Sequence, residues 1–302
     1  MRTTIRLTFK QHRFGVLGFG IILVAIAAGA AALAVYFNSL DIGTCATEVS
    51  EACDAIAQQM GAMVGPMYLL RGASVPIAIL AGVFVGVPIV ASEIERGTAI
   101  LPWTVVRSRV RWFLPRVLIV GGVLVFLTAL VGLSLDAMHQ SLYPLVPITA
   151  DLNWYEARGW LVPARALVGF AVGVLAGAAL GRSLPGLFAG LVISGVMLAG
   201  TFAVGGTLNQ THLVDVSGDP GALRLTLALH DHTTGVYMGY EEAEQIMWPG
   251  DPAFTERFEE VYLGVPGSSS VLVVTRDVAI HGALALMAIV AAAVVVDRRR
   301  PY

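Results

Sequence analysis

Long apolar stretches alternate with short polar segments along this chain of 302 residues. Six of the stretches come close to the roughly 20 residues that a helix needs to cross the hydrocarbon core of a bilayer. They are residues 14–37, 74–92, 112–135, 162–181, 184–203 and 278–296. The pattern predicts an all-α polytopic membrane protein with six transmembrane helices, forming a single transmembrane domain over residues 1–302.

The distribution of charge predicts an orientation. If the N-terminus is cytoplasmic, the cytoplasmic segments are residues 1–13, 93–116, the turn at Arg182, and residues 297–302. They hold 13 of the 19 Lys and Arg residues but only three of the 21 Asp and Glu residues. By the positive-inside rule, both termini are therefore expected in the cytoplasm.

The first 13 residues are basic and mildly amphipathic. Ile5, Leu7 and Phe9 interleave with basic residues, which is typical of an interfacial helix on the inner leaflet. A frayed basic N-terminus explains the same pattern equally well.

Composition excludes a soluble globular domain. Charged residues make up 13% of the chain and hydrophobic residues 56%, whereas soluble domains carry roughly 25% charged residues. The formal net charge of -2 and the lack of a basic patch or zinc-finger motif give no support to nucleic-acid binding.

Both cysteines, Cys45 and Cys53, fall in the predicted outer loop 38–73. Disulfides persist outside the cell, so a Cys45–Cys53 bridge is favoured over two free thiols on compartment alone.

The outer loop between the last two spans, residues 204–277, is unusually long. Asp251 followed by Pro252 is typical of a helix start, and Phe254, Phe258 and Val261 then recur at helical spacing. We expect a large helical extracellular loop over residues 204–277 that forms a cap or a re-entrant element on the outer face.

Small residues recur every four positions in the fourth span, at Gly169, Gly173, Gly177 and Gly181. This spacing lets helix backbones approach closely. It predicts a tight helix–helix seam, either within the subunit or at a dimer axis.

Ionisable residues are scarce within the predicted spans. Arg116, Arg165, Asp277 and His281 lie near predicted span ends, where their side chains can reach the interface. A carrier coupled to protons or ions usually needs buried charge at the midplane, so another source of energy is expected.

Candidate catalytic chemistry is weak. His230, Asp231 and His232, with His212 nearby, match no closed metal site, so we expect no metal. No zincin, serine-hydrolase or nucleotide-binding motif occurs, and we expect no enzymatic activity from this chain. Glu93 and Glu95 could form the carboxylate pair of an intramembrane protease, but they lie at a span end beside a basic connector.

The connector between the second and third spans carries an unusual set of residues. They are Glu93, Glu95, Arg96, Gly97, Thr98, Trp103, Arg107, Arg109 and Arg111. A solvated loop that obeys the positive-inside rule would account for the basic residues alone. The two glutamates and the Gly-Thr pair do not follow from that rule, which favours a docking surface for a cytoplasmic partner.

Residues 80–121 resemble the actinobacterial permeases of the type-2 ABC exporter class (type V fold). The resemblance rests on a Glu-x-Glu-x-Gly-Thr element at the end of the second span, then Trp-Thr, Ser-Arg and Arg-Trp pairs leading into the third. In this chain these residues are Glu93, Glu95, Gly97, Thr98, Trp103, Thr104, Ser108, Arg109, Arg111 and Trp112. Pro102 departs from the pattern, where a small residue is expected.

The resemblance implies the permease subunit of an exporter in a bacterial plasma membrane. A separate ATP-binding subunit would bind ATP and Mg, and two copies of each would form the working complex. Residues 93–111 would be the coupling helix region seated on that subunit. The permease itself would bind no cofactor and would move an amphiphile, such as an antibiotic, a lipid-like metabolite or a peptide, by alternating access.

Two other functions remain open at this point. One is an ATPase-driven mechanotransmitting or signalling protein that acts through the cap at residues 204–277. The other is a membrane-embedded enzyme that uses the outer histidines or the inner glutamates.

Overall fold

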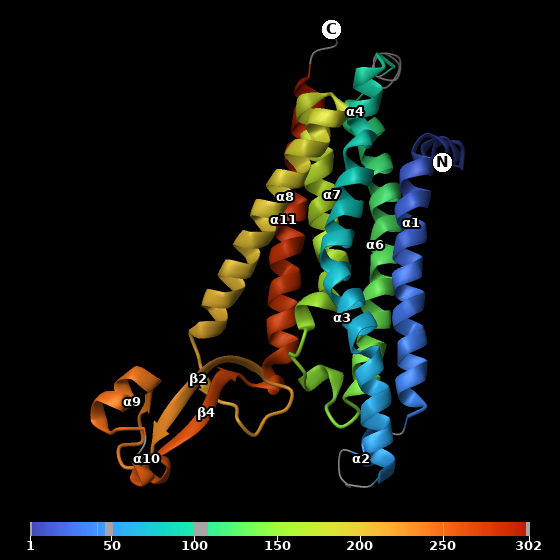
Figure 1. Cartoon of the computed structure of the whole chain (residues 1–302). Helices are drawn as coiled ribbons and strands as arrows, with labels where there is room; N and C mark the ends of the chain where they lie inside the picture. Colours follow the sequence, from blue (N-terminus) through green and yellow to red (C-terminus); the bar gives the residue numbers. More distant parts are fainter. Residues whose placement is uncertain (1, 41, 46–50, 99–107, 250, 300–302) are drawn as a thin grey trace. The chain divides into compact units, whose positions relative to one another are not determined.

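The computed structural model describes residues 2–40, 42–45, 51–98, 108–249 and 251–299 (Figure 1). The chain divides into two compact units. The helical unit comprises residues 1–145, 154–201 and 274–302, and the sheet unit comprises residues 146–153 and 202–273.

Long helices build the helical unit, and two of them, α8 and α11, continue into the sheet unit. The elements are α1 (Arg2–Asn38), α2 (Ile42–Cys45), α3 (Glu51–Gly86), α4 (Pro88–Glu95), α6 (Arg109–Leu142), η2 (Tyr155–Ala157), α7 (Leu161–Leu180), α8 (Ser183–Gln210) and α11 (Ser270–Arg298). Helix α1 begins, and α11 ends, at the same end of the helical unit (Figure 1).

Six stretches of these helices are long and apolar enough to cross a membrane. They are Leu17–Asn38, Cys53–Glu95, Arg109–Leu142, Leu161–Leu180, Ser183–Gln210 and Gly267–Arg298. The prediction of six spanning helices is therefore confirmed. The helix ends differ: α3 begins at Glu51, whereas the sequence pattern predicts a loop up to residue 73. The hydropathy pattern marks only the apolar part of a helix that can lie in lipid. Residues of high helix propensity can extend the same helix past the end of that apolar part.

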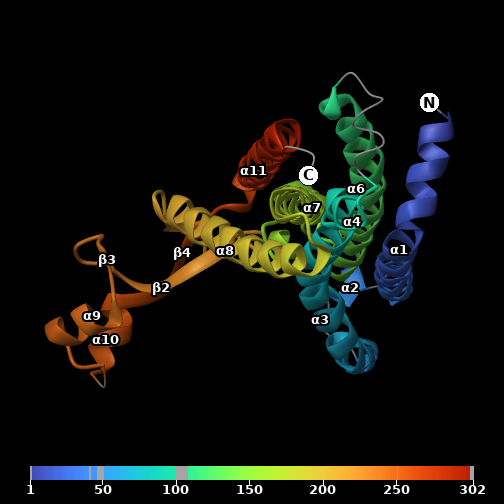
Figure 2. The same ribbon diagram turned by 90° about the horizontal axis from the view of Figure 1, so that it is seen from above.

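Helix α7 lies at the centre of the helical unit, packed against α3, α4 and α6 (Figure 2). Its burial follows from its small residues. The Gly169, Gly173 and Gly177 positions lie against the backbone of α3 and its continuation at Val87. A Cβ built at Gly177 would lie 2.4 Å from the Val87 carbonyl oxygen, so these helices contact each other through their backbones. Three of the four glycines in the predicted run thus lie in a seam within the chain.

Gly181 has a different role from the other three. Its φ is 64°, in the left-handed region, and its amide donates to the Gly177 carbonyl oxygen at 2.9 Å. This is the usual way in which a glycine ends a helix, and it places the turn to α8 directly after α7.

The sheet unit contains a four-stranded antiparallel sheet in the order β1-β4-β2-β3. Its elements are η1 (Ile148–Ala150), β1 (Val214–Asp215), β2 (Leu223–Asp231), β3 (Tyr237–Met238), α9 (Tyr240–Ile246), α10 (Pro252–Arg257), β4 (Phe258–Val265) and η3 (Gly267–Ser269). The expectation of a helical cap is therefore wrong for most of this segment.

The wrong prediction of a helical cap arises from residues 251–261, of which only the first part is helical. Asp251 does cap α10, accepting a hydrogen bond from the Ala253 amide at 2.9 Å. The helix then ends at Arg257, and Phe258 and Val261 lie on β4. Aromatic and β-branched residues favour a strand wherever another strand is present to pair with them, and β2 supplies that partner from about thirty residues upstream.

A small core and a buried ion pair hold the sheet unit together. Leu229, Ala243, Phe254 and Phe258 form the core. The fully buried Asp231 carboxylate accepts from Arg257 Nη2 at 2.8 Å. The Arg257 guanidinium, with hydrogen bonds from Thr233, holds the pKa of the Asp231 carboxyl well below its usual range.

Candidate functional site

The connector after α4 is the first candidate site, and the structure describes its two ends, residues 93–98 and 108–111. Trp103 and Arg107 from the predicted docking set lie outside the described residues, as does Pro102. The two described ends are sufficient to show how the connector joins the bundle.

Gly97 and Thr98 end helix α4. Gly97 has a φ of 68° and donates its amide to the Ile94 carbonyl oxygen, while the Thr98 amide donates to the Glu93 carbonyl oxygen, each at 3.0 Å. These two hydrogen bonds form a Schellman motif, which satisfies the last carbonyl groups of a helix. The Gly-Thr pair of the sequence motif therefore has a structural task at this position.

The Glu93 side chain joins α4 to α6. It is buried, and its Oε1 lies 2.6 Å from Arg116 Nη1. The Arg116 guanidinium also lies 4.2 Å from the centre of the Trp112 ring. From the sequence, Glu93 is expected on a docking surface and Arg116 at a lipid interface; in the structure the two pair inside the bundle.

Glu95 joins α4 to the start of α8. Its Oε2 accepts from the Ser183 amide at 3.0 Å and from Ser183 Oγ at 2.7 Å. Side chains two residues apart on a helix point in different directions, so Glu93 and Glu95 contact different helices. We call Glu93, Glu95, Arg116 and Ser183 the carboxylate clamp. The clamp fixes the end of α4 to both α6 and α8.

Two arginines bind helix C-termini at this end of the bundle. Arg109 Nη1 donates to the carbonyl oxygen of Asp297, in the last turn of α11, and to that of Arg299, just after the helix. Arg299 Nη1 donates to the carbonyl oxygen of Ala178 near the end of α7. Cations are favoured there because the last carbonyl groups of a helix carry partial negative charge. Of the described docking set, Glu95, Arg96, Gly97, Thr98 and Arg111 are exposed.

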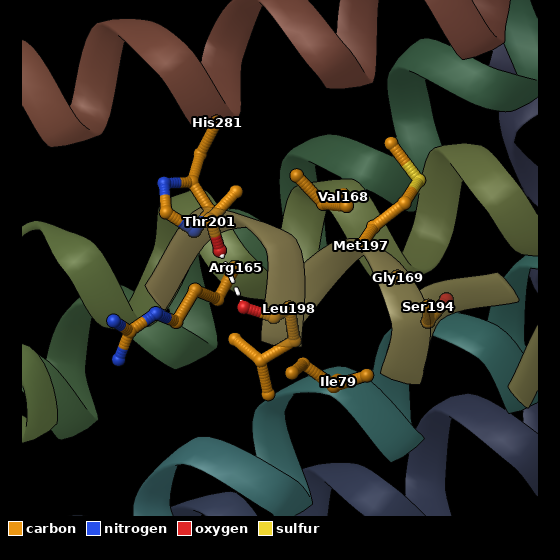
Figure 3. A pocket seen from close by; sticks show the side chains of 9 residues that line it. All are labelled: Ile79, Arg165, Val168, Gly169, Ser194, Met197, Leu198, Thr201 and His281. Atoms are coloured by element: carbon orange, nitrogen blue, oxygen red, sulfur yellow. Dashed lines mark hydrogen bonds between the residues drawn. The ribbon is translucent and has the colours of Figure 1, made fainter. Parts of the chain in front are cut away.

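A small pocket toward the other end of the helical unit is the second candidate site (Figure 3). The cavity is small, with a volume of about 10 Å³, which is room for about one water molecule. Its lining residues come from α3, α7, α8 and α11, and they are Ile79, Arg165, Val168, Gly169, Ser194, Met197, Leu198, Thr201 and His281. The apolar side chains make most of the wall, and a few polar groups interrupt it.

Two polar atoms at this pocket stand out. Ser194 Oγ and His281 Nε2 are buried and have no hydrogen-bond partner among the described residues. Thr201 instead donates to the Leu198 carbonyl oxygen at 2.8 Å, as Figure 3 shows. Buried polar groups normally have partners, so Ser194 and His281 are suited to receive a polar group from outside the chain.

The prediction that ionisable residues lie near span ends agrees with Arg165, which is near the start of α7, but it is wrong for His281. Arg165, Asp277 and His281 are each at most 9% exposed. Helix α11 begins at Ser270, so His281 lies well inside it. The residues form a network: Tyr155 Oη donates to Asp277 Oδ2 at 3.2 Å, and Arg165 Nη1 donates to the Glu156 carbonyl oxygen. Burial also raises the pKa of the Glu156 carboxyl.

A second buried polar group escaped the sequence reasoning. Arg71 Nη2 lies 2.7 Å from His139 Nδ1, and both side chains are almost fully buried. Three residues before His139, Asp136 Oδ1 pairs with Arg158 Nη1 at 2.9 Å. Arg71 and His139 lie in segments predicted as loops, where polar residues are common and do not indicate a buried site. Extending each helix beyond its apolar centre would have placed both in the bundle.

The structure joins the Sγ atoms of Cys45 and Cys53, which links α2 to the first turn of α3. The histidines considered for a metal lie in the sheet unit, with His230 on β2 and His232 just after it. His212 lies before β1 and is exposed.

Comparison with known proteins identifies one family. A family model described as ABC-2 membrane transporter related matches residues 16–204. The match covers the described connector, the carboxylate clamp and every pocket residue except His281. No curated protein and no solved structure matches the chain.

Proposed function

Because the chain belongs to the ABC-2 membrane transporter related family, we propose that it is the permease of an ABC exporter that moves an amphiphile out of the cell by alternating access. Its family and its six apolar helices make it a multi-pass membrane protein of the permease type. The family also implies an ATP-binding partner within an ABC transporter system.

The carboxylate clamp is the observation that best supports this mechanism. It ties the exposed turn at Arg96–Thr98 to α6 through Glu93 and to α8 through Glu95. A partner that pushes on this turn would therefore displace two spanning helices together. In the proposed complex, two ATP-binding subunits dock beneath two permeases, with ATP and Mg on the partner and both permease termini in the cytoplasm.

Charge reversal at the exposed end of the connector tests the docking step. We expect Arg96→Glu combined with Arg111→Glu to weaken co-purification of the ATP-binding subunit about tenfold. A partner surface that attracts the two arginines would repel two glutamates, because like charges across an interface are costly. Both side chains are exposed and take no part in the clamp, so the permease itself stays folded. The measurement is the amount of P-loop protein recovered with the tagged permease, identified by mass spectrometry.

The matched control is Arg224→Glu, which reverses an exposed positive charge on β2 in the sheet unit. Equal recovery from the connector variant and from this control would contradict docking at Arg96 and Arg111. Failure of the wild-type permease to recover any P-loop protein would contradict the exporter function itself.

The amphiphilic cargo is supported by the chemistry of the pocket lining and not by the size of the cavity, which is about 10 Å³ in this conformation. Its walls are mostly apolar, whereas Ser194 and His281 offer polar atoms without partners among the described residues. A molecule with an apolar body and a polar end matches both parts of this lining.

One observation favours a second candidate function. Residues 202–273 belong to a separate compact unit with its own core, and most of that unit lies beyond the family match. Such a unit suits a mechanotransmitting protein, in which the ATPase drives a movement that acts on a partner outside the cell.

Filling the pocket distinguishes the two functions. Ser194→Leu adds bulk inside the pocket, whereas Ala199→Leu adds it on an exposed part of α8. For an exporter, we expect an extract of cellular lipids to stimulate ATP hydrolysis by the reconstituted complex. Ser194→Leu should abolish this stimulation, and Ala199→Leu should leave it intact. Stimulation that is equal in both variants would favour the mechanotransmitting function.

A further inference from the structure

Three candidate metal ligands converge where β2 ends beside the start of β4. His230 lies directly opposite Glu259 in the antiparallel register. Directly opposite residues project from the same face of a sheet, with Cβ atoms about 4.5–5.5 Å apart. His232 is two residues beyond His230, and its amide donates to the Arg257 carbonyl oxygen at 2.9 Å. This hydrogen bond keeps His232 beside β4 after β2 has ended.

The ligand atoms of these residues are close enough to share one ion. One nitrogen of each histidine and one carboxylate oxygen all lie within 4.8 Å of one another. His232 Nε2 is already 3.5 Å from Glu259 Oε2. Ligands at about 2.0–2.2 Å from a tetrahedral zinc ion are roughly 3.3–3.6 Å apart, so small side-chain rotations would complete the arrangement.

The sheet holds this cluster in place from behind. Asp231, between the two histidines, is fully buried and binds Arg257 Nε at 3.1 Å and Nη2 at 2.8 Å. The His230 ring stacks on the Tyr237 ring of β3 at a centroid distance of 4.9 Å. His232 and Glu259 remain exposed, with side-chain exposures of 47% and 61%. The backbone is thus fixed while the ligand atoms stay accessible to an ion.

We propose that His230, His232 and Glu259 form a binding site for one Zn²⁺ ion. Two imidazoles and one carboxylate are the donor types that Zn²⁺ takes, and Ca²⁺ or Mg²⁺ would instead require oxygen ligands. Three protein ligands leave a fourth position for water or for a group from outside the chain. The site lies entirely within the sheet unit, so it is independent of the exporter function proposed above.

Zinc titration of the whole protein tests the site. The permease is purified in detergent with an affinity tag that contains no histidine, stripped with a chelator, and titrated with Zn²⁺ by calorimetry. We expect one ion per chain, competition by Co²⁺ with a visible absorption band, and no binding of Mg²⁺. Loss of a residue that hydrogen-bonds to a metal ligand typically weakens metal affinity about 10–100-fold. Loss of a ligand itself should cost at least as much, so we expect His232→Ala to weaken Zn²⁺ binding at least tenfold.

Two further variants make the result decisive. Glu259→Gln keeps the side-chain shape and should also weaken binding at least tenfold, with the metal-free protein melting as the wild type does. His212→Ala removes an exposed histidine outside the cluster and should leave the affinity unchanged. Zn²⁺ affinity that is equal in the wild type, His232→Ala and Glu259→Gln would overturn the proposal, as would an absence of Zn²⁺ binding by the wild type.

Discussion

Glu93→Lys is expected to prevent stable folding of the helical unit. The Glu93 and Arg116 side chains are only 9% and 14% exposed, with 2.6 Å between Oε1 and Nη1. Removing one partner of a buried ion pair leaves an uncompensated charge and costs about 3–5 kcal/mol. A second cation beside Arg116 adds repulsion to that cost. Since whole domains are stable by only about 5–15 kcal/mol, we expect loss of the monodisperse peak in detergent chromatography and a large fall in melting temperature.

Two companion variants separate the ion pair from a general effect of charge. The exchange Glu93→Arg with Arg116→Glu restores opposite charges and should recover part of the lost melting temperature. Glu95→Gln removes only an exposed carboxylate that accepts hydrogen bonds from Ser183, and it should melt close to the wild-type temperature, because solvent screens an exposed charge. A Glu93→Lys protein that melts like Glu95→Gln would show that the buried pair does not stabilise the bundle.

Gly82→Ala is expected to separate α3 from α7. A Cβ at this position would lie 2.4 Å from the Ala166 carbonyl oxygen and 2.6 Å from the Phe170 amide nitrogen. Both are backbone atoms, so no side-chain rotation can relieve the clash and the helices must move apart. Overpacking of this kind costs about 1–3 kcal/mol and occasionally more. Combining the change with Gly177→Ala, on the α7 side of the same seam, should prevent stable folding.

Gly122→Ala is the matched control for the glycine seam. Gly122 lies inside α6, and nothing lies within 4 Å of a Cβ built there. Alanine is the better helix former by about 0.5–1 kcal/mol, so this variant should melt at or slightly above the wild-type temperature. Equal melting temperatures for Gly82→Ala and Gly122→Ala would show that close backbone packing is not required.

The structural roles of the Glu-x-Glu-x-Gly-Thr element help to design further experiments. Glu93, Gly97 and Thr98 contribute to helix termination and to internal contacts. A loss of transport after mutation of these residues would therefore not by itself demonstrate contact with the ATP-binding subunit. Arg96 and Arg111 are better probes of that contact, because they are exposed and lie outside the clamp.

Local patterns in the sequence were sufficient for several features. The six spanning helices follow from runs of apolar residues, because lipid accepts only segments whose backbone hydrogen bonds are satisfied internally. The start of α10 follows from Asp251 and Pro252, which act on the nearest amide groups. The four-residue glycine period marked the surface along which α7 packs, because that period keeps small residues on one helix face.

The tertiary structure decided which partner each side chain meets. Phe258 and Val261 satisfy a helical spacing, yet they lie on β4 because β2 is available to pair with them. Glu93 becomes a buried structural residue only because α6 brings Arg116 to it. His230 and His232 match no metal motif because their third partner, Glu259, arrives on a neighbouring strand. Sequence periodicity reports the environment of one element, whereas these contacts join elements that are distant along the chain, and only folding brings them together.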